Sequence, residues 1–394
     1  MNVFDQTVTR RQLRTYQLEL LNRQLLYAVE RSPFYNEHLR GCELPLASPD
    51  ALAGLPLMDS VDITQYGFAL SCLPQREIQR IVTLKTSGTT GASKRVFFTR
   101  GDIERTVDFF AVGMRYLCGP GDAVAVFMPG ATADGIGHQL RRALERFGAR
   151  PRIYGAVADV ADAAAFLRDG NYHTLVGIPA QMRALALACP ELRPANVLLS
   201  ADYVPLSLKS AVERLWHTSC FEHYGMTETC YGFAVDCPCH QGMHIRHDEF
   251  LVEIVDEAGR PLLPGQWGEI VITSLRREAM PIIRYRTGDR GRLLAEPCAC
   301  GSVLPRLDHV QGRIRALREP LNIHALDELL LDLDPVRDYT ARREGNSLTV
   351  FVSGDPAVFP VVKSRLAGAY PALRITVLPG EPFRTTGTLK RTLE

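Results

Sequence analysis

The first apolar pattern in the chain is helical. Leu18, Leu21, Leu25 and Val29 recur at intervals of three or four residues, and the pattern breaks at Ser32-Pro33. Apolar residues with this spacing lie on one face of an α-helix, and a proline stops a helix from continuing. We therefore expect an amphipathic helix near the amino terminus, with a structural role.

Short β-rich runs begin at residue 81 and alternate with helical stretches. The runs are Ile81–Leu84, Val96–Thr99, Ala123–Met128, Thr174–Ile178 and Val197–Leu199. Strands that alternate with helices along a chain usually form a mostly parallel sheet with helices on both faces. The expected fold class is therefore α/β.

The pattern changes after Phe250. Two strand-like runs, Leu251–Val255 and Glu269–Thr273, are separated by the turn signal Glu257-Ala258-Gly259-Arg260. Strands joined by turn residues rather than by helices usually pair antiparallel. The sequence thus predicts an antiparallel β region after the α/β part.

Another apolar pattern starts after Gly312-Arg313. It predicts, in order, a helix at Ala325–Leu331, a strand at Leu348–Val352, a helix at Val361–Ala369 and a strand at Arg374–Leu378. The length of 394 residues also exceeds the usual size of one hydrophobic core. We expect a large domain over residues 1–312 and a small α+β domain over residues 313–394.

The composition excludes several classes of partner. The chain has 45 basic and 44 acidic residues, so it carries no electrostatic footprint for nucleic acid or for an anionic membrane, and we expect neither partner. Residues 1–17 are polar, and no later segment offers about 18 uninterrupted apolar residues. We predict a cytoplasmic protein whose ten cysteines are reduced, some of them bound to metal.

The strongest local signal is a loop between two predicted strands. It reads Thr86-Ser87-Gly88-Thr89-Thr90-Gly91-Ala92-Ser93-Lys94. Small residues expose backbone N–H groups, hydroxyls add hydrogen-bond donors and the lysine adds positive charge, so the loop suits a polyphosphate. Its spacing differs from that of a Walker-type loop. Standing alone, such a segment is more often a simple Ser/Thr/Gly turn.

Two short cysteine clusters suggest a metal site. They are Cys237-Pro238-Cys239-His240 and Cys298-Ala299-Cys300-Gly301. Two such clusters can close a tetrahedral zinc site, which is structural when all four ligands come from the protein. The preferred ligands are Cys237, His240, Cys298 and Cys300, and Cys239 could replace His240 or Cys237. Buried free thiols are the alternative.

Three further motifs follow the loop in order. They are Tyr224-Gly225-Met226-Thr227-Glu228, Tyr285-Arg286-Thr287-Gly288-Asp289 and Gly312-Arg313. With this order of motifs the chain resembles the adenylate-forming superfamily of acyl-CoA synthetases, non-ribosomal adenylation domains and luciferases. Three phrases favour the phenylacetate-CoA ligase and coenzyme F390 synthetase branch, namely Ser32-Pro33-Phe34-Tyr35, Gly242-Met243-His244-Ile245 and the run from Pro281 to Asp289.

The resemblance implies a large domain of mostly parallel sheets with an antiparallel β region, a small mobile C-terminal domain, and an ATP site. Thr86, Ser87, Gly88, Thr89, Thr90, Gly91 and Lys94 would surround the β- and γ-phosphates, and Glu228 would hold Mg²⁺. Tyr224 would stack on the adenine, with Gly225, Met226 and Thr227 in the same motif. Asp289 would bind the ribose hydroxyls, and Arg313 would pair with the nucleotide at the domain hinge. Ser200, Ala201 and Asp202 would line the adenine and acyl pockets.

The C-terminal motif departs from the family pattern. Thr388 occupies the position at which the family has a catalytic lysine, and Lys390 follows two residues later. A strand would place both side chains on one face, so Lys390 is the candidate for that role.

The acyl pocket is less specified. Phe127, His138 and Tyr231 could line an apolar slot for an aromatic or short acyl group. Ordinary core residues are the commoner fate of such side chains, and a helix histidine is the commoner reading of His138.

These observations predict an AMP-forming ligase. It would activate a small carboxylic acid, with an aromatic acid as the leading candidate, to acyl-AMP and transfer the acyl group to coenzyme A. Its cofactors would be ATP, Mg²⁺ and a structural Zn²⁺. A second hypothesis is an adenylating ligase that delivers the acyl group to an amine or a carrier protein. A third is a non-catalytic, zinc-stabilised nucleotide-binding homologue. A homodimer is expected only by analogy.

Overall fold

The computed structural model describes residues 8–85, 93–381 and 393, and its chain divides into two units. The first unit combines the residues up to Tyr116 with His223–Ile314, and the second combines Leu117–Glu222 with the residues from Arg315 onward. This division differs from the expected one, because the C-terminal segment groups with part of the expected large domain. Only the boundary after Ile314 lies near the predicted boundary after residue 312. The mobile small domain remains a prediction.

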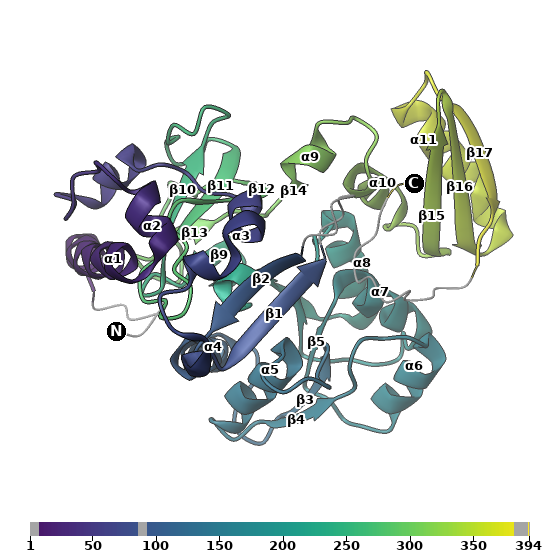
Figure 1. The fold of residues 1–394 in the computed structure, drawn as a ribbon. Helices are drawn as coiled ribbons and strands as arrows, with labels where there is room; N and C mark the ends of the chain where they lie inside the picture. Colours follow the sequence, from purple (N-terminus) through teal and green to yellow (C-terminus); the bar gives the residue numbers. More distant parts are fainter. Residues whose placement is uncertain (1–7, 86–92, 382–392, 394) are drawn as a thin grey trace. The chain divides into compact units, whose positions relative to one another are not determined.

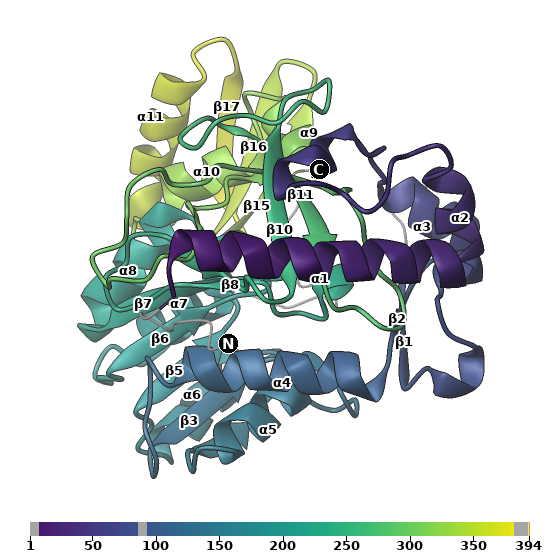
Figure 2. The same ribbon diagram turned by 90° about the vertical axis from the view of Figure 1, so that its left-hand side faces the viewer.

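The first unit begins with two helices. α1 (Arg10–Arg31) starts at a capping box in which Thr9 and Gln12 satisfy each other's backbone N–H groups. It ends at Ser32, whose side chain caps α2 (Pro33–His38). The predicted amphipathic helix and its break at Ser32-Pro33 are therefore confirmed. Figure 2 shows α1 as one long straight helix.

Two antiparallel strands flank the predicted phosphate loop. β1 (Arg80–Lys85) and β2 (Ser93–Phe98) form a two-stranded sheet of their own, and α4 (Arg100–Met114) follows directly (Figure 1). Short helical elements cover Pro49–Gly54 (η1), Ser60–Tyr66 (α3), Gly67–Leu70 (η2), Gln75–Glu77 (η3) and Thr227–Thr229 (η4). Residues 86–92 of the phosphate loop lie outside the described part of the chain.

An antiparallel sheet follows Phe250, as predicted. Its strands are β10 (Phe250–Val255), β11 (Gly268–Ser274), β12 (Tyr285–Gly291) and β14 (Gly312–Arg313), in that order. The sequence pattern missed β12, because its buried and half-buried positions alternate while its residues are largely polar. The rest of the unit adds β8 (Ala234–Val235), β9 (Met243–Ile245) and β13 (Arg306–Leu307), with β9 between the other two.

The second unit contains a parallel sheet, as predicted, but the first two predicted runs, at residues 81–84 and 96–99, belong instead to the antiparallel pair β1 and β2. The strands of the parallel sheet are β3 (Ala123–Phe127), β4 (Arg150–Ile153), β5 (Thr174–Gly177), β6 (Asn196–Leu199) and β7 (Ser219–Tyr224), and they lie in the order β4-β3-β5-β6-β7. The connecting helices are α5 (Ile136–Glu145), α6 (Val160–Arg168), α7 (Pro179–Ala188) and α8 (Leu206–Trp216). β7 continues into the first unit at His223, where its last residues pair with β8.

The C-terminal segment also belongs to the second unit. It comprises α9 (Ile314–Leu317), whose first residue ends the first unit, then α10 (Ile323–Leu330), β15 (Val336–Glu344), β16 (Ser347–Gly354), η5 (Pro356–Val358), α11 (Phe359–Ala369) and β17 (Arg374–Pro379). β16 pairs antiparallel with β15 and parallel with β17, which confirms the predicted α+β character (Figure 1). Lys390 lies outside the described residues.

Specific polar contacts explain why the C-terminal segment groups with the parallel sheet. The buried guanidinium of Arg183 on α7 donates to the carbonyl oxygens of Leu331 and Leu333. The carboxylate of Glu328 on α10 accepts from the N–H groups of Leu206 and Ser207, at the first turn of α8. An anion is stabilised at a helix N-terminus, so both hydrogen bonds of Glu328 are favourable.

No helix of the described residues is long and apolar enough to cross a membrane.

Candidate active site

Three side chains from separate elements meet in the first unit. Lys94 on β2, Glu228 on η4 and Tyr285 at the start of β12 are 8%, 7% and 2% exposed. The ammonium of Lys94 forms an ion pair with Oε1 of Glu228 and donates to the Tyr285 hydroxyl at 2.8 Å. That hydroxyl donates to Oε1 of Glu228 at 2.7 Å. The structure thus brings two predicted residues together and adds a third.

The electrostatics of this group keep the carboxylate ionised. Burial acts to raise the pKa of Glu228, but the charge of Lys94 and the hydrogen bonds from Lys94 and Tyr285 lower that pKa below its usual value. Burial and the neighbouring carboxylate raise the pKa of Tyr285, so its hydroxyl keeps its proton. The group therefore places the Glu228 carboxylate, which can bind a cation, next to the Lys94 ammonium, which can bind a phosphate.

A second group joins the same two motifs. The Tyr224 hydroxyl donates to Oδ2 of Asp289 at 2.6 Å, and Nε of Arg313 lies 3.1 Å from Oδ1 of Asp289. Arg313 also donates to the carbonyl oxygen of Thr287. Tyr224, Asp289 and Arg313, predicted for the adenine, the ribose and the hinge, therefore lie together. Their contacts with a nucleotide remain predictions.

A tight turn presents Glu228. Gly225 approaches the backbone so closely that a Cβ there would lie 1.9 Å from the carbonyl oxygen of Tyr231. Cys230 and Tyr231 have φ values of 55° and 72°, in the left-handed region that side chains rarely adopt. Backbone strain of this kind persists only where the surroundings impose it, and it is frequent at functional sites. Met226 and Thr227 close the turn through backbone hydrogen bonds.

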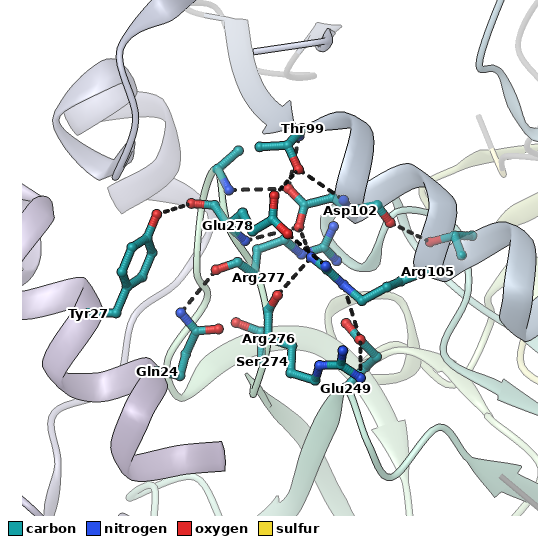
Figure 3. A network of polar contacts seen from close by, with 12 residues as sticks. Gln24, Tyr27, Thr99, Asp102, Arg105, Glu249, Ser274, Arg276, Arg277 and Glu278 are labelled. Carbon is teal, nitrogen blue, oxygen red and sulfur yellow. Dashed lines mark hydrogen bonds and ion pairs between the residues drawn. The ribbon is translucent and has the colours of Figure 1, made fainter. Parts of the chain in front are cut away.

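A largely buried polar network connects α4 to the segment that precedes β12 (Figure 3). One carboxylate, Asp102 in the first turn of α4, completes the capping box by accepting from the N–H of the N-cap residue Thr99 at 3.0 Å, and it also accepts from the N–H groups of Glu278 and Ala279 at 3.0 and 3.2 Å. Arg105 pairs with Asp102 at 2.7 Å and with Glu278 at 2.8 Å. The end of β2 is thereby fixed to the connection that leads to β12.

Arg277 links this network to Glu228. Its guanidinium lies over the rings of Phe98 and Phe250, 5.2 and 5.9 Å from their centroids, and donates to the carbonyl oxygen of Glu228 at 3.3 Å. From α1, Gln24 donates to the carbonyl oxygen of Arg277 (Figure 3). Sequence reasoning missed Arg277, since its partners come from elements that are distant along the chain.

The structure revises the acyl-pocket prediction. Phe127 is fully buried and packs against Tyr154 and Phe166 in the core of the second unit, so its side chain is a core residue. Nδ1 of His138 accepts from the N–H of Asp134 at the start of α5, which is the alternative that the sequence left open. Tyr231 lies in the strained turn after Glu228.

Ser200, Ala201 and Asp202 belong to the second unit and follow β6 directly. Ser200 is buried, and Ala201 has a left-handed φ of 73°. Asp202 lines a small pocket of that unit together with His324 and Asp327 of the C-terminal segment. Their predicted contact with adenine remains a prediction.

The cysteine clusters do come together, but with a different histidine. The donor atoms of Cys237, His244, Cys298 and Cys300 all lie within 4.8 Å of one another. His240, the predicted fourth ligand, instead places Nδ1 2.8 Å from Oδ2 of Asp236, and Cys239 is not in the group. The pairing of β9 with β13 decides this, because it sets His244 opposite Arg306, just after the second cluster.

The geometry of this cluster fits a tetrahedral zinc ion. The sulfur atoms of Cys237 and Cys298 lie 3.7 Å apart, and tetrahedral Zn–S bonds of about 2.3 Å place two sulfurs about 3.8 Å apart. The Cys300 sulfur lies 3.3 Å from Nε2 of His244. Burial lowers the pKa of His244 to about 4, so its imidazole is neutral near pH 7 and can act as a ligand.

Solved structures share this fold. A 2-hydroxyisobutyryl-CoA ligase in its postadenylation state, in complex with 2-HIB-AMP, aligns with a TM-score of 0.81 at 21% identity over 96% of this chain and 88% of that chain. The amide bond synthetase McbA from Marinactinospora thermotolerans aligns with a TM-score of 0.55 at 17% identity over 79% of this chain and 67% of that chain. The fold is thus that of the adenylate-forming ligases.

The sequence comparisons define the family. The family model for AMP-binding enzymes matches residues 79–275, which are half of the 394 residues, and the chain therefore belongs to this family. The phenylacetate-coenzyme A ligase of Thermus thermophilus is 28% identical over 86% of this chain and 80% of its own length. That of Pseudomonas putida is 29% identical over 76% of this chain and 70% of its own length. These relatives confirm the resemblance to the phenylacetate-CoA ligase branch.

Proposed function

We propose that this protein activates a small carboxylic acid with ATP to form acyl-AMP and then transfers the acyl group to coenzyme A. The observation that carries the proposal is the pairing of Lys94 with Glu228 beside the group of Tyr224, Asp289 and Arg313. The family match and the names of the relatives, which are phenylacetate-coenzyme A ligases, support it.

The residues suit the charge changes of adenylation. A carboxylate attacks the α-phosphorus and pyrophosphate leaves, so the site has to hold two anions together and stabilise the negative charge of the leaving group. Mg²⁺, when bound, supplies positive charge to the phosphate oxygens, and Glu228 is the residue that would hold it. Lys94 would bind the phosphates, and Asp289 would bind the ribose hydroxyls. The turn that presents Glu228 would fix the position of its carboxylate relative to Lys94 and Asp289.

The acid and the acceptor belong to this proposal as well. An aromatic acid is the leading substrate, because the relatives are named for phenylacetate. Coenzyme A is the proposed acceptor on the same ground. An amine or a carrier protein is the second candidate, and the likeness to an amide bond synthetase does not decide between them, since it concerns the fold alone.

We also propose a structural zinc ion held by Cys237, His244, Cys298 and Cys300. Purified protein should contain about one zinc per chain, because four protein ligands close the coordination sphere. His244→Ala should lose the metal and lower the thermal midpoint, whereas His240→Ala, the matched control, should keep it. The opposite pattern in the metal analysis would restore His240 as the ligand.

A cytoplasmic location and a homodimer stay predictions.

The decisive experiment measures acid-dependent exchange of labelled pyrophosphate into ATP, with coenzyme A omitted, across aryl, short-chain and amino acids. Exchange with one class of acid would establish adenylation and name the substrate. Coenzyme A is then added, and formation of the thioester identifies the acceptor. If the adenylate forms but coenzyme A is not acylated, an amine or a carrier protein becomes the acceptor. Absence of exchange by folded, zinc-loaded protein would favour the non-catalytic homologue.

Two variants assign the exchange to this site. Glu228→Gln should abolish most of it, because the amide cannot supply the negative charge that holds Mg²⁺. Glu253→Gln is the matched control, since the Glu253 side chain is also largely buried and ion-paired, with Arg284, but lies outside the site. Equal losses in both variants would assign the effect to folding instead.

A further inference from the structure

The two motifs of the site pair with each other in a reciprocal way. In each motif a tyrosine precedes an acidic residue by four positions, namely Tyr224 with Glu228 and Tyr285 with Asp289. The hydroxyl of Tyr224 binds the acid of the other motif, Asp289, at 2.6 Å. The hydroxyl of Tyr285 binds Glu228 at 2.7 Å. Neither pairing is visible in the sequence, since each tyrosine binds the distant acid.

The strand geometry of β12 makes this arrangement available. Alternate residues of a strand point to one face, so Tyr285 and Asp289 share a face of β12. Both are buried, whereas Arg286 and Gly288 between them are partly exposed. One strand therefore presents both a hydroxyl to the pair of Lys94 and Glu228 and a carboxylate to Tyr224.

Tyr285 differs from Tyr224 because its hydroxyl binds two charged groups at once. It accepts from the Lys94 ammonium at 2.8 Å while it donates to Glu228. A buried ion pair is costly unless further hydrogen bonds satisfy its remaining donors and acceptors. Hydrogen bonds to charged groups are also stronger than those between neutral groups. The phenol thus fixes both charges while it carries none itself.

We propose, on the basis of the proposed function, that Tyr285 is a positioning residue for binding of the metal–polyphosphate. Its hydroxyl holds the Glu228 carboxylate and the Lys94 ammonium in the arrangement that receives the phosphates and their metal ion. Because the hydroxyl forms hydrogen bonds with these two side chains, which would hold the phosphates and their metal ion, it sets the affinity for MgATP and leaves the affinity for the carboxylic acid unchanged.

The test is the variant Tyr285→Phe in the pyrophosphate exchange assay. Removing one hydrogen bond to charged groups should raise KM for MgATP about tenfold or more while KM for the acid stays the same. Tyr35→Phe is the matched control. The Tyr35 hydroxyl is also fully buried and binds the connection to β12, through the carbonyl oxygen of Pro281 and the N–H of Ile283. This variant should lose stability but keep both KM values.

A double variant separates positioning from general packing. If Tyr285 acts through Glu228, adding Tyr285→Phe to Glu228→Gln should weaken MgATP binding little further, because the group to be positioned is already altered. Calorimetric titration of MgATP measures this without turnover. The proposal would be overturned if the two losses of MgATP affinity were fully additive, or if KM rose equally for MgATP and for the acid. It would also be overturned if the Tyr285→Phe chain did not fold while the Tyr35→Phe chain did. Wild-type protein without exchange would refute the proposed function instead.

Discussion

At the scale of single residues, the site is a set of charges that neutralise one another inside the first unit. Lys94 balances Glu228, and Arg313 balances Asp289. All four were named from the sequence, through the resemblance that their motifs carry. The sequence assigned no role to Tyr285 or Arg277, since these two take part through contacts that only the fold creates.

Replacing Lys94 should affect catalysis and stability together. Lys94→Met removes the phosphate-binding charge and leaves a buried carboxylate unpaired, so we expect pyrophosphate exchange to fall at least about a hundredfold and stability to fall by about 3–5 kcal/mol. Denaturant unfolding and the exchange assay measure the two effects. Lys209→Met removes another largely buried, ion-paired lysine and should lower stability alone. The double variant Lys94→Met/Glu228→Gln should regain stability without regaining exchange.

Buried His223 makes the stability of the fold sensitive to acid. Burial lowers the pKa of His223 from 6.5 to about 4. Between these two pH values the unfolded chain binds more protons than the folded chain. The contribution of neutral His223 to the free energy of unfolding is therefore fully present above about pH 6.5 and is lost as the pH decreases toward 4. His223→Phe should flatten this part of the curve of unfolding midpoint against pH. An unchanged slope in the variant would show that other groups cause the acid sensitivity.

At the scale of elements, the N-terminus of α4 is held by contacts with a distant part of the chain. Asp102 completes the capping box of this helix with the N-cap residue Thr99 and also binds the connection that leads to β12. The capping box itself could be read from Thr99 and Asp102 in the sequence. The additional contacts with Glu278 and Ala279 depend on a sequence separation of more than 170 residues.

Asp102 should therefore be worth more than an ordinary cap. Asp102→Ala leaves buried N–H groups without their acceptor and removes one of the carboxylates paired with Arg105, and we expect a loss of about 3 kcal/mol or more in the free energy of unfolding. Asp159→Ala removes the cap of α6 alone, where Asp159 binds two backbone N–H groups, and should cost about 1 kcal/mol. Similar losses for both variants, measured by denaturant unfolding, would contradict the added role of Asp102.

At the scale of the whole molecule, the division into two units does not follow the order of the chain. Each unit is built from two separate stretches of sequence. In the second unit, Leu326 and Leu330 of α10 belong to the same buried cluster as Met182 and Leu185 of α7. The apolar residues of α10 indicated that one face of this helix is buried, but they did not indicate that this face shares a buried cluster with α7.

Arg183 should control how firmly the C-terminal segment is held. Arg183→Ala removes the donors for the carbonyl groups of Leu331 and Leu333, which follow α10. We expect the amide hydrogens of α10 to exchange with solvent faster, because opening of this segment costs less free energy. Arg193→Ala, which removes an exposed arginine of the same unit, should leave exchange unchanged. Unaltered protection of α10 in the Arg183 variant would show that apolar packing alone holds it.

The sequence by itself determined the elements and the candidate chemistry. Apolar periodicity is a local property, so it located α1, the parallel strands β3, β5 and β6, the antiparallel region and the C-terminal α+β segment, but not β4 or β7. The order of the motifs carried the resemblance to the adenylate-forming superfamily, and that resemblance implied the roles of Lys94, Glu228, Tyr224, Asp289 and Arg313. Partners across long separations were decided only by the tertiary structure. Strand pairing selected His244 over His240, β12 set Tyr285 against Glu228, and packing placed Phe127 in the core, since each depends on which surfaces meet when the chain folds.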